Sequence, residues 1–143
     1  PPFAAALTHA DILCTTPSAT APFLLAAMVP TGAHLNAVGG SMPYLRELQP
    51  DCVPALGFFT DYRPSLEAQA GEVIDARAAG LVAADWRATE IGEVIAGTHP
   101  GRTSDAERTI YRSLGVASQD LAAADFIAAR AIETRCGFEV AWR

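Results

Sequence analysis

Three short apolar segments of this chain each end in small or polar residues, and this pattern restricts the possible folds most strongly. The segments are residues 10–16 (ADILCTT), 33–38 (AHLNAV) and 57–61 (GFFTD). Each is followed within a few residues by a proline or a pair of glycines. Short apolar runs bounded by turn residues are typical of buried strands. Because segments of helical pattern separate them, the sequence predicts an α/β fold with a parallel sheet flanked by helices.

The remaining segments complete this expectation. Residues 109–113 and 138–142 are further candidate strands, and residues 98–108 form a polar surface loop. The longest predicted helix covers about residues 116–136, where small apolar residues recur at steps of three and four and form one apolar face. Shorter helical segments are expected at 21–29 (helix or turn), 45–56, 65–70, 72–79 and 90–96.

Length and charge limit the classes of function. The chain has 143 residues, enough for one domain, and 10 basic against 16 acidic residues give a net charge of −6. An acidic chain without a basic cluster is not expected to bind nucleic acid or an anionic membrane surface. The longest apolar run, residues 21–30, is shorter than the ~18 residues that cross a bilayer. With no recognisable signal peptide, we expect a cytoplasmic protein without a membrane partner.

Neither the cysteines nor the histidines predict a metal site. Cys14, Cys52 and Cys136 lack the spacing of metal ligands, so we expect reduced and mostly buried thiols. His9 and His99 are isolated, and His34 is expected to be a packed, hydrogen-bonded residue of its strand. No metal is predicted.

Parallel sheets bind ligands beyond the carboxyl ends of their strands. Here those ends carry residues 15–18, residues 39–41 and the turn after Asp61. Hydroxyl groups and free backbone N–H groups at a strand end suit a sugar or a phosphate, and glycine lets a ligand approach the backbone closely. Ordinary Thr-Pro and Gly-Gly turns would give the same pattern.

Taken together, seven short motifs resemble the ornithine cyclodeaminase/mu-crystallin family in order and spacing, over nearly the whole chain. They are residues 10–18 (ADILCTTPS), residues 32–39 (GAHLNAVG), residues 46–48 (REL), Asp61 with Gly71 ten residues later, residues 91–97 (IGEVIAG), residues 100–102 (PGR) and residues 111–115 (YRSLG).

This resemblance implies a Rossmann domain that binds NAD or NADP, in a homodimer acting on a small imino or amino acid. The chain contains no G-x-G-x-x-G or G-x-G-x-x-A turn, the segment that holds the pyrophosphate in such domains. We therefore expect residues 1–143 to be the C-terminal part of an incomplete NAD(P)-binding domain. Its first strand would be an exposed edge, and its last helix would return toward an N-terminal substrate and dimerisation domain.

Residue by residue, the resemblance implies contacts with the cofactor at the strand ends and one residue at the substrate. The implied cofactor contacts are Thr15, Thr16, Pro17, Ser18, Val38, Gly39, Gly40, Ser113 and Leu114, and the implied catalytic residue is Ser41. The resemblance also suggests a salt-bridged helix start at Arg46 and Glu47. Asp61 is expected to cap a helix.

Ser41 decides between the activities of the family. In ornithine cyclodeaminases the matching residue is an aspartate that acts as acid and base, whereas ketimine reductases resembling mu-crystallin have serine. A serine without a partner base does not transfer protons as a carboxylate does, but imine reduction mainly needs cofactor and substrate in place. We therefore expect an NAD(P)-dependent reductase of a cyclic imino acid, a ketimine or Δ1-pyrroline-2-carboxylate, giving proline or pipecolate. The alternatives are ornithine cyclodeaminase and a non-catalytic binding protein or inactive fragment, and Ser41 could also be a turn serine before Pro43.

Overall fold

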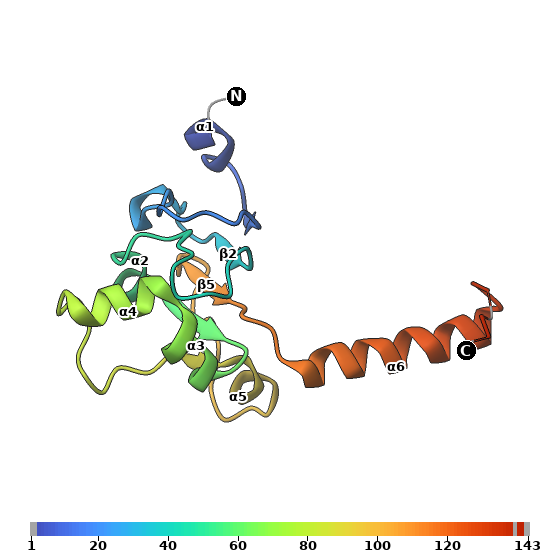
Figure 1. Cartoon of the computed structure of the whole chain (residues 1–143). Coiled ribbons are helices and arrows are strands. Elements are labelled where there is room, and N and C mark those ends of the chain that lie inside the picture. The colour runs from blue at the N-terminus through green and yellow to red at the C-terminus, as the bar shows by residue number, and fades with distance from the viewer. Residues whose placement is uncertain (1–2, 139, 142–143) are drawn as a thin grey trace.

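A five-stranded parallel sheet forms the centre of the computed structural model, which describes residues 3–138, 140 and 141 (Figure 1). The spatial order is β1-β2-β5-β3-β4, and every neighbouring pair is parallel. This confirms the predicted α/β class and four of the predicted strands, with slightly shorter bounds. The strands are β1 (Ile12–Thr15), β2 (His34–Ala37), β3 (Gly57–Thr60), β4 (Thr89–Glu90) and β5 (Thr109–Arg112). The short β4 was not predicted, and residues 138, 140 and 141 of the last predicted strand are not in a strand.

Helices follow most of the predicted segments. They are α1 (Phe3–Leu7), the 3-10 helix η1 (Ala26–Met28), α2 (Cys52–Ala55), α3 (Arg63–Gln69), α4 (Gly71–Ala78), α5 (Ile91–Ile95) and α6 (Ala117–Thr134). The helix predicted over 45–56 is reduced to α2. Residues 46–49 instead pair with residues 19–24, through Arg46 N–H to the Ala19 carbonyl and Gln49 N–H to the Leu24 carbonyl. Pro50 disfavours helix only in the residue before it, and the pairing with residues 19–24 keeps the rest of the segment out of a helix.

One face of the sheet is fully packed. In register across β1, β2, β5 and β3 lie Leu13, Leu35, Ile110 and Phe58, all buried. Buried residues of α2, α3 and α4 belong to the same core, and Figure 1 shows these helices together beside the sheet. The opposite face is more open, and Ile12 at its edge is 68% exposed. His34 lies half-buried on this face with its Nδ1 2.8 Å from the Thr109 hydroxyl, which confirms the prediction of a hydrogen-bonded histidine.

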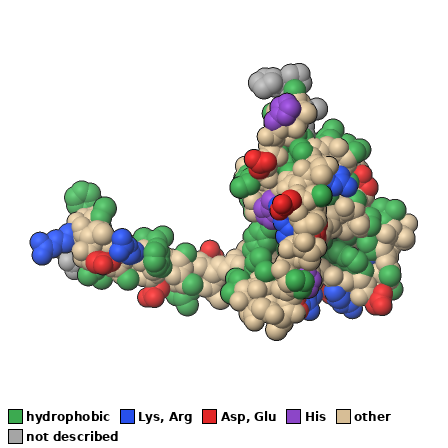
Figure 2. All heavy atoms as spheres, turned by 180° about the vertical axis from the view of Figure 1, so that it is seen from behind, with side chains coloured by type: hydrophobic (Ala, Val, Ile, Leu, Met, Phe, Trp, Pro, Cys, Tyr) green, Lys and Arg blue, Asp and Glu red, His purple; other side chains and the backbone are tan. Residues whose placement is uncertain are grey.

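Helix α6 projects away from the sheet (Figures 1 and 2). Its large apolar residues are exposed, for example Leu121 at 73% and Phe126 at 66%. Its small-residue face contacts no other part of the described chain closely enough to become buried. Among the helices that the structure describes, none has the length and hydrophobicity needed to cross a membrane.

The expectation of mostly buried cysteines is wrong, because only Cys52 is buried while Cys14 and Cys136 are exposed. Burial raises the pKa of the Cys52 thiol to about 12, and the charge of Asp51 adds to this shift. Since the thiolate is the reactive form, Ellman's reagent at pH 8 should label two thiols rapidly and the third only after unfolding in guanidinium. Rapid labelling of all three in the native chain would contradict the structure.

Candidate functional site

The loops that follow β1, β2 and β5 lie side by side at the carboxyl edge of the sheet. Beyond the strand ends, Val38 N–H donates to the Thr15 carbonyl at 3.0 Å and Ser113 N–H donates to the Ala37 carbonyl at 3.2 Å. Gly39 lies directly against the first loop, since a Cβ on it would be 2.2 Å from the carbonyl oxygen of Pro17. The structure therefore brings the three groups of predicted cofactor residues together: residues 15–18, 38–40 and 113–114.

The hydroxyl groups of the first two loops differ in their exposure to solvent. Thr15 is buried, and its hydroxyl has no hydrogen-bond partner within the described chain. Thr16, Ser18 and Ser41 are exposed, as is Val38. This edge therefore presents exposed hydroxyl groups, and the missing side chain of Gly39 lets the first two loops meet there. Hydroxyl groups can donate to and accept from a sugar such as the ribose of a nucleotide.

The loop that carries Ser41 is anchored on its far side by the start of α4. A Cβ on Gly71 would be 2.9 Å from the Pro43 carbonyl oxygen, so the helix begins in close contact with this loop. Arg46 holds Asp75 of α4 with Nε–Oδ2 at 2.5 Å and Nη2–Oδ1 at 3.0 Å. The hydrogen bond from Arg46 holds the pKa of the Asp75 carboxyl below its usual value.

Arg46 and Glu47 do not begin a helix, so that expectation is wrong. Arg46 forms its salt bridge with Asp75 of another element, and Glu47 is buried with neither carboxylate oxygen hydrogen-bonded within the described chain. The reason is the extended pairing of residues 46–49 with residues 19–24, which turns the two side chains in different directions.

Asp61 holds the turn after β5 and does not cap a helix, which corrects the expectation from the sequence. Its Oδ2 accepts hydrogen bonds from the Ser113 hydroxyl at 3.0 Å, from Leu114 N–H at 2.8 Å and from Gly115 N–H at 2.7 Å. Helix α3 begins after Tyr62, and its first N–H group, that of Arg63, donates to Oε1 of Glu90 at 2.8 Å. The strand order explains the difference, because β3 and β5 are neighbours and place Asp61 opposite the turn at 113–115.

Replacing Asp61 with Asn should loosen this turn. The amide keeps one acceptor oxygen but loses the charge that strengthens all three bonds, so we expect the free energy of unfolding to fall by about 1–3 kcal/mol. Hydrogen exchange at the amides of Leu114 and Gly115 should become faster. Asp85→Asn, at an exposed position, is the matched control and should change neither quantity. Unchanged exchange in Asp61→Asn would contradict this role.

Arg112, which no sequence pattern marked as a site residue, is buried beneath the same loops. Its Nε donates to Oε1 of Glu72 at 2.6 Å, and both side chains are fully buried. The only sequence signal was a charged residue at the end of an apolar strand. Nothing in the sequence marked Glu72 as its partner, because the two residues are 40 positions apart.

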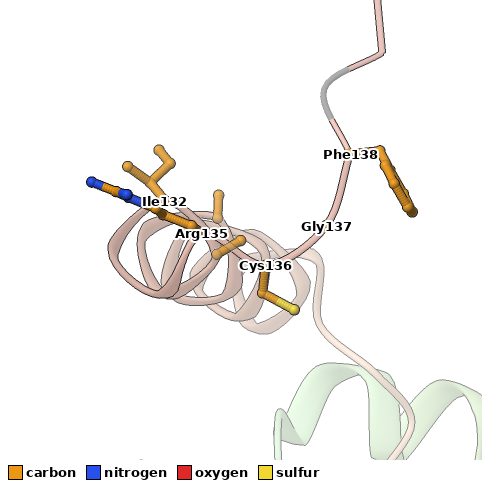
Figure 3. A pocket seen from close by; sticks show the side chains of 7 residues that line it. Ile132, Arg135, Cys136, Gly137 and Phe138 are labelled. Atoms are coloured by element: carbon orange, nitrogen blue, oxygen red, sulfur yellow. The ribbon is translucent and has the colours of Figure 1, made fainter.

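An open surface hollow lies elsewhere, at the end of α6 (Figure 3). It is mostly apolar and is lined by Ala128, Ala131, Ile132, Arg135, Cys136, Gly137 and Phe138. It contains none of the strand-end residues. Within the described residues, no three His, Cys, Asp or Glu side chains are grouped so that they could hold a metal ion.

The geometry thus defines a class: a parallel α/β domain with a strand-end site built from glycine and hydroxyl residues, as in dinucleotide-binding domains. The chain belongs to the ornithine cyclodeaminase/mu-crystallin family, whose model matches residues 3–135. This confirms the resemblance that the seven sequence motifs indicated.

Individual relatives agree with this assignment. The ketimine reductase mu-crystallin of Mus musculus is 38% identical over 122 residues, which are 85% of this chain and 36% of the relative. The structure of Thermococcus litoralis Δ1-pyrroline-2-carboxylate reductase with NADH and L-proline superposes with a TM-score of 0.84 at 26% identity, over 96% of this chain and 43% of the other. An archaeal alanine dehydrogenase dimer with bound NAD superposes with a TM-score of 0.81 at 31% identity, over 100% of this chain and 44% of the other.

The chain spans only about two fifths of the length of these relatives. The roles of Ser41 and of the cofactor residues remain predictions.

Proposed function

We propose that this chain supplies the nicotinamide side of an NAD(P)-dependent reductase that converts a cyclic imino acid to proline or pipecolate. The observation that carries the proposal is the position of Ser41, exposed in the loop after Gly39 and Gly40, beside the loops at 15–18 and 113–114. The names of the mouse and Thermococcus relatives support this substrate class.

The residues fit a nicotinamide nucleotide, either NAD or NADP. Thr15, Thr16, Pro17 and Ser18 would hold the ribose, and Val38, Gly39 and Gly40 would contact the ring from one side. Ser113 and Leu114 would contact it from the turn that Asp61 holds in place. When bound, the nicotinamide supplies the hydride.

Ser41 would orient the substrate carboxylate or a water molecule. Its hydroxyl has no carboxylate or imidazole partner in the described chain that could make it a proton carrier. Reduction of a protonated imine requires no such carrier at this position, because the carbon accepts hydride directly. This favours imine reduction over deamination of ornithine.

Three open surfaces support the prediction that the chain is part of a larger domain. They are the edge of β1 at Ile12, the open face of the sheet and the projecting helix α6. Parallel sheets are normally covered on both faces. We therefore propose that sequence preceding this chain covers the edge and the open face of the sheet, and that α6 returns toward a substrate and dimerisation domain. The homodimer and the cytoplasmic location belong to this proposal, and the dimeric alanine dehydrogenase supports the former.

The proposal is tested on the complete protein encoded by the gene that contains this sequence. Calorimetric titration should show saturable binding of NADH or NADPH, and steady-state assays should show reduction of Δ1-pyrroline-2-carboxylate or its six-membered homologue. Release of ammonia and proline from ornithine, without reduction of cyclic imines, would establish ornithine cyclodeaminase instead. Absence of both activities with retained nucleotide binding would establish a non-catalytic binding protein.

The Ser41→Ala variant should separate an orienting role from a proton-transfer role. Loss of one hydrogen bond to the substrate, about 1 kcal/mol, should lower kcat/KM for imine reduction by roughly tenfold or less. Loss of a general acid would lower it by about 10²–10⁴-fold. Ser104→Ala, in the exposed loop at 98–108, is the matched control and should have no effect. A loss above about 10²-fold would reject the orienting role.

A further inference from the structure

The guanidinium group of Arg112 contacts the backbone of both loops that flank the proposed nicotinamide site. Its Nη1 donates to the Ala37 carbonyl at 3.2 Å and to the Ser113 carbonyl at 3.0 Å. Its Nη2 donates to the carbonyl of Gly40, the residue before Ser41. One buried side chain therefore joins the end of β2, the Ser41 loop and the turn after β5.

Glu72 makes this arrangement possible inside the protein. A guanidinium group without a counter-charge would be very costly to bury, and the Glu72 carboxylate on Nε neutralises it. Because Nε is used for Glu72, both terminal nitrogens are free to donate to the loop carbonyls. Glu72 lies in the first turn of α4, the helix that also packs against Pro43 beyond Ser41.

An ion pair with a purely structural role could lie anywhere in the core. Here all three carbonyl acceptors lie at the proposed site: one is Ala37 at the end of β2, and the other two, Gly40 and Ser113, belong to the loops that follow β2 and β5. The planar guanidinium group suits this task, because it donates in several fixed directions at once, whereas a lysine ammonium is a compact point charge.

We propose that Arg112 is a positioning residue that fixes the Ser41 loop and the turn at 113–115 relative to each other, and so determines the affinity for the nicotinamide half of the dinucleotide. This inference rests on the proposed function. It makes Arg112 act through the loop backbone, without contact with the substrate.

The test compares two ligands in the complete protein. NADH carries the nicotinamide, whereas ADP-ribose lacks it and reports on the rest of the site. If the protein prefers NADPH to NADH, NADPH and 2′-phospho-ADP-ribose are used in place of this pair. Arg112→Lys keeps the charge opposite Glu72 but cannot serve all three carbonyls. We expect its Kd for NADH to rise about tenfold, the equivalent of one lost hydrogen bond, and its Kd for ADP-ribose to stay within about twofold.

Two further variants separate positioning from stability. Val73→Ala shortens a buried apolar side chain next to Glu72 in the sequence, and this side chain forms no hydrogen bond with either loop. The variant should therefore lower Tm and leave the ratio of the two Kd values unchanged. The double variant Arg112→Gln/Glu72→Gln replaces the ion pair with two amides and leaves no charge unpaired, so it serves if Arg112→Lys does not fold. It should raise the Kd ratio as Arg112→Lys does.

Equal changes in both Kd values, or no change in either, would overturn the positioning role. Failure of the wild-type protein to bind either nicotinamide nucleotide would instead overturn the proposed function, so the two failures are distinguishable.

Discussion

Replacing Arg112 with Met should lower the free energy of unfolding by about 3–5 kcal/mol, the cost of leaving a buried charge without its partner. Both members of the Arg112–Glu72 pair are fully buried, so no water can solvate the carboxylate that remains. The three loop carbonyls would also lose their donor. Urea unfolding followed by circular dichroism measures the change.

Two controls show whether the loss comes from the unpaired charge. The double variant Arg112→Met/Glu72→Met removes both charges and should recover much of the stability, because apolar residues often replace a buried ion pair at little cost. Arg130→Met breaks an exposed pair with Glu133 on α6 and should cost less than about 1 kcal/mol. A cost for Arg112→Met no larger than that of Arg130→Met would contradict the buried pair.

Replacing Gly39 with Ala should separate the loops that the site requires. The new Cβ would lie 2.2 Å from the carbonyl oxygen of Pro17 and 2.6 Å from its nitrogen, and backbone atoms cannot rotate away as a side chain does. The φ angle of Gly39 is not among the positive ones, so the effect is purely steric. We expect a loss of about 1–3 kcal/mol or more in stability.

The same substitution should weaken nicotinamide nucleotide binding by at least about tenfold, since displacement of either loop costs about one hydrogen bond or more to the ligand. Urea unfolding and calorimetry with NADH measure the two effects. Gly92→Ala is the matched control, because its Cβ meets nothing within 4 Å on helix α5, where alanine is favoured over glycine. If Gly39→Ala had the same stability and the same affinity for NADH as the wild-type protein, this would contradict the contact between the loops.

Local pattern was sufficient for much of the fold. Residues 10–16, 33–38 and 57–61 were predicted as strands because short apolar runs between turn residues are typical of buried strands, and residues 109–113 because their side chains alternate. Strands β1, β2, β3 and β5 lie within these segments. The helix predicted from residue 116 onward is α6, since its period of three to four residues belongs to a helix alone. The grouping of the predicted site at the strand ends followed from the parallel sheet.

Other features depended on which strands became neighbours. Residues 46–49 are extended because they pair with residues 19–24, a contact between distant segments that overrides their own helical preference. Asp61 binds the turn at 113–115 because β3 lies beside β5. Neither contact has a signal at the level of neighbouring residues.

The sequence by itself determined four of the five strands, the long helix α6, the family and the residues expected at the cofactor and substrate. Tertiary structure alone decided that Arg112 and Glu72 form a buried pair and that this pair holds the loops of Ala37, Gly40 and Ser113. The physical reason is range: periodicity and turn propensity act over a few residues, whereas a buried charge is tolerated only where folding brings its partner and its hydrogen-bond acceptors from distant parts of the chain.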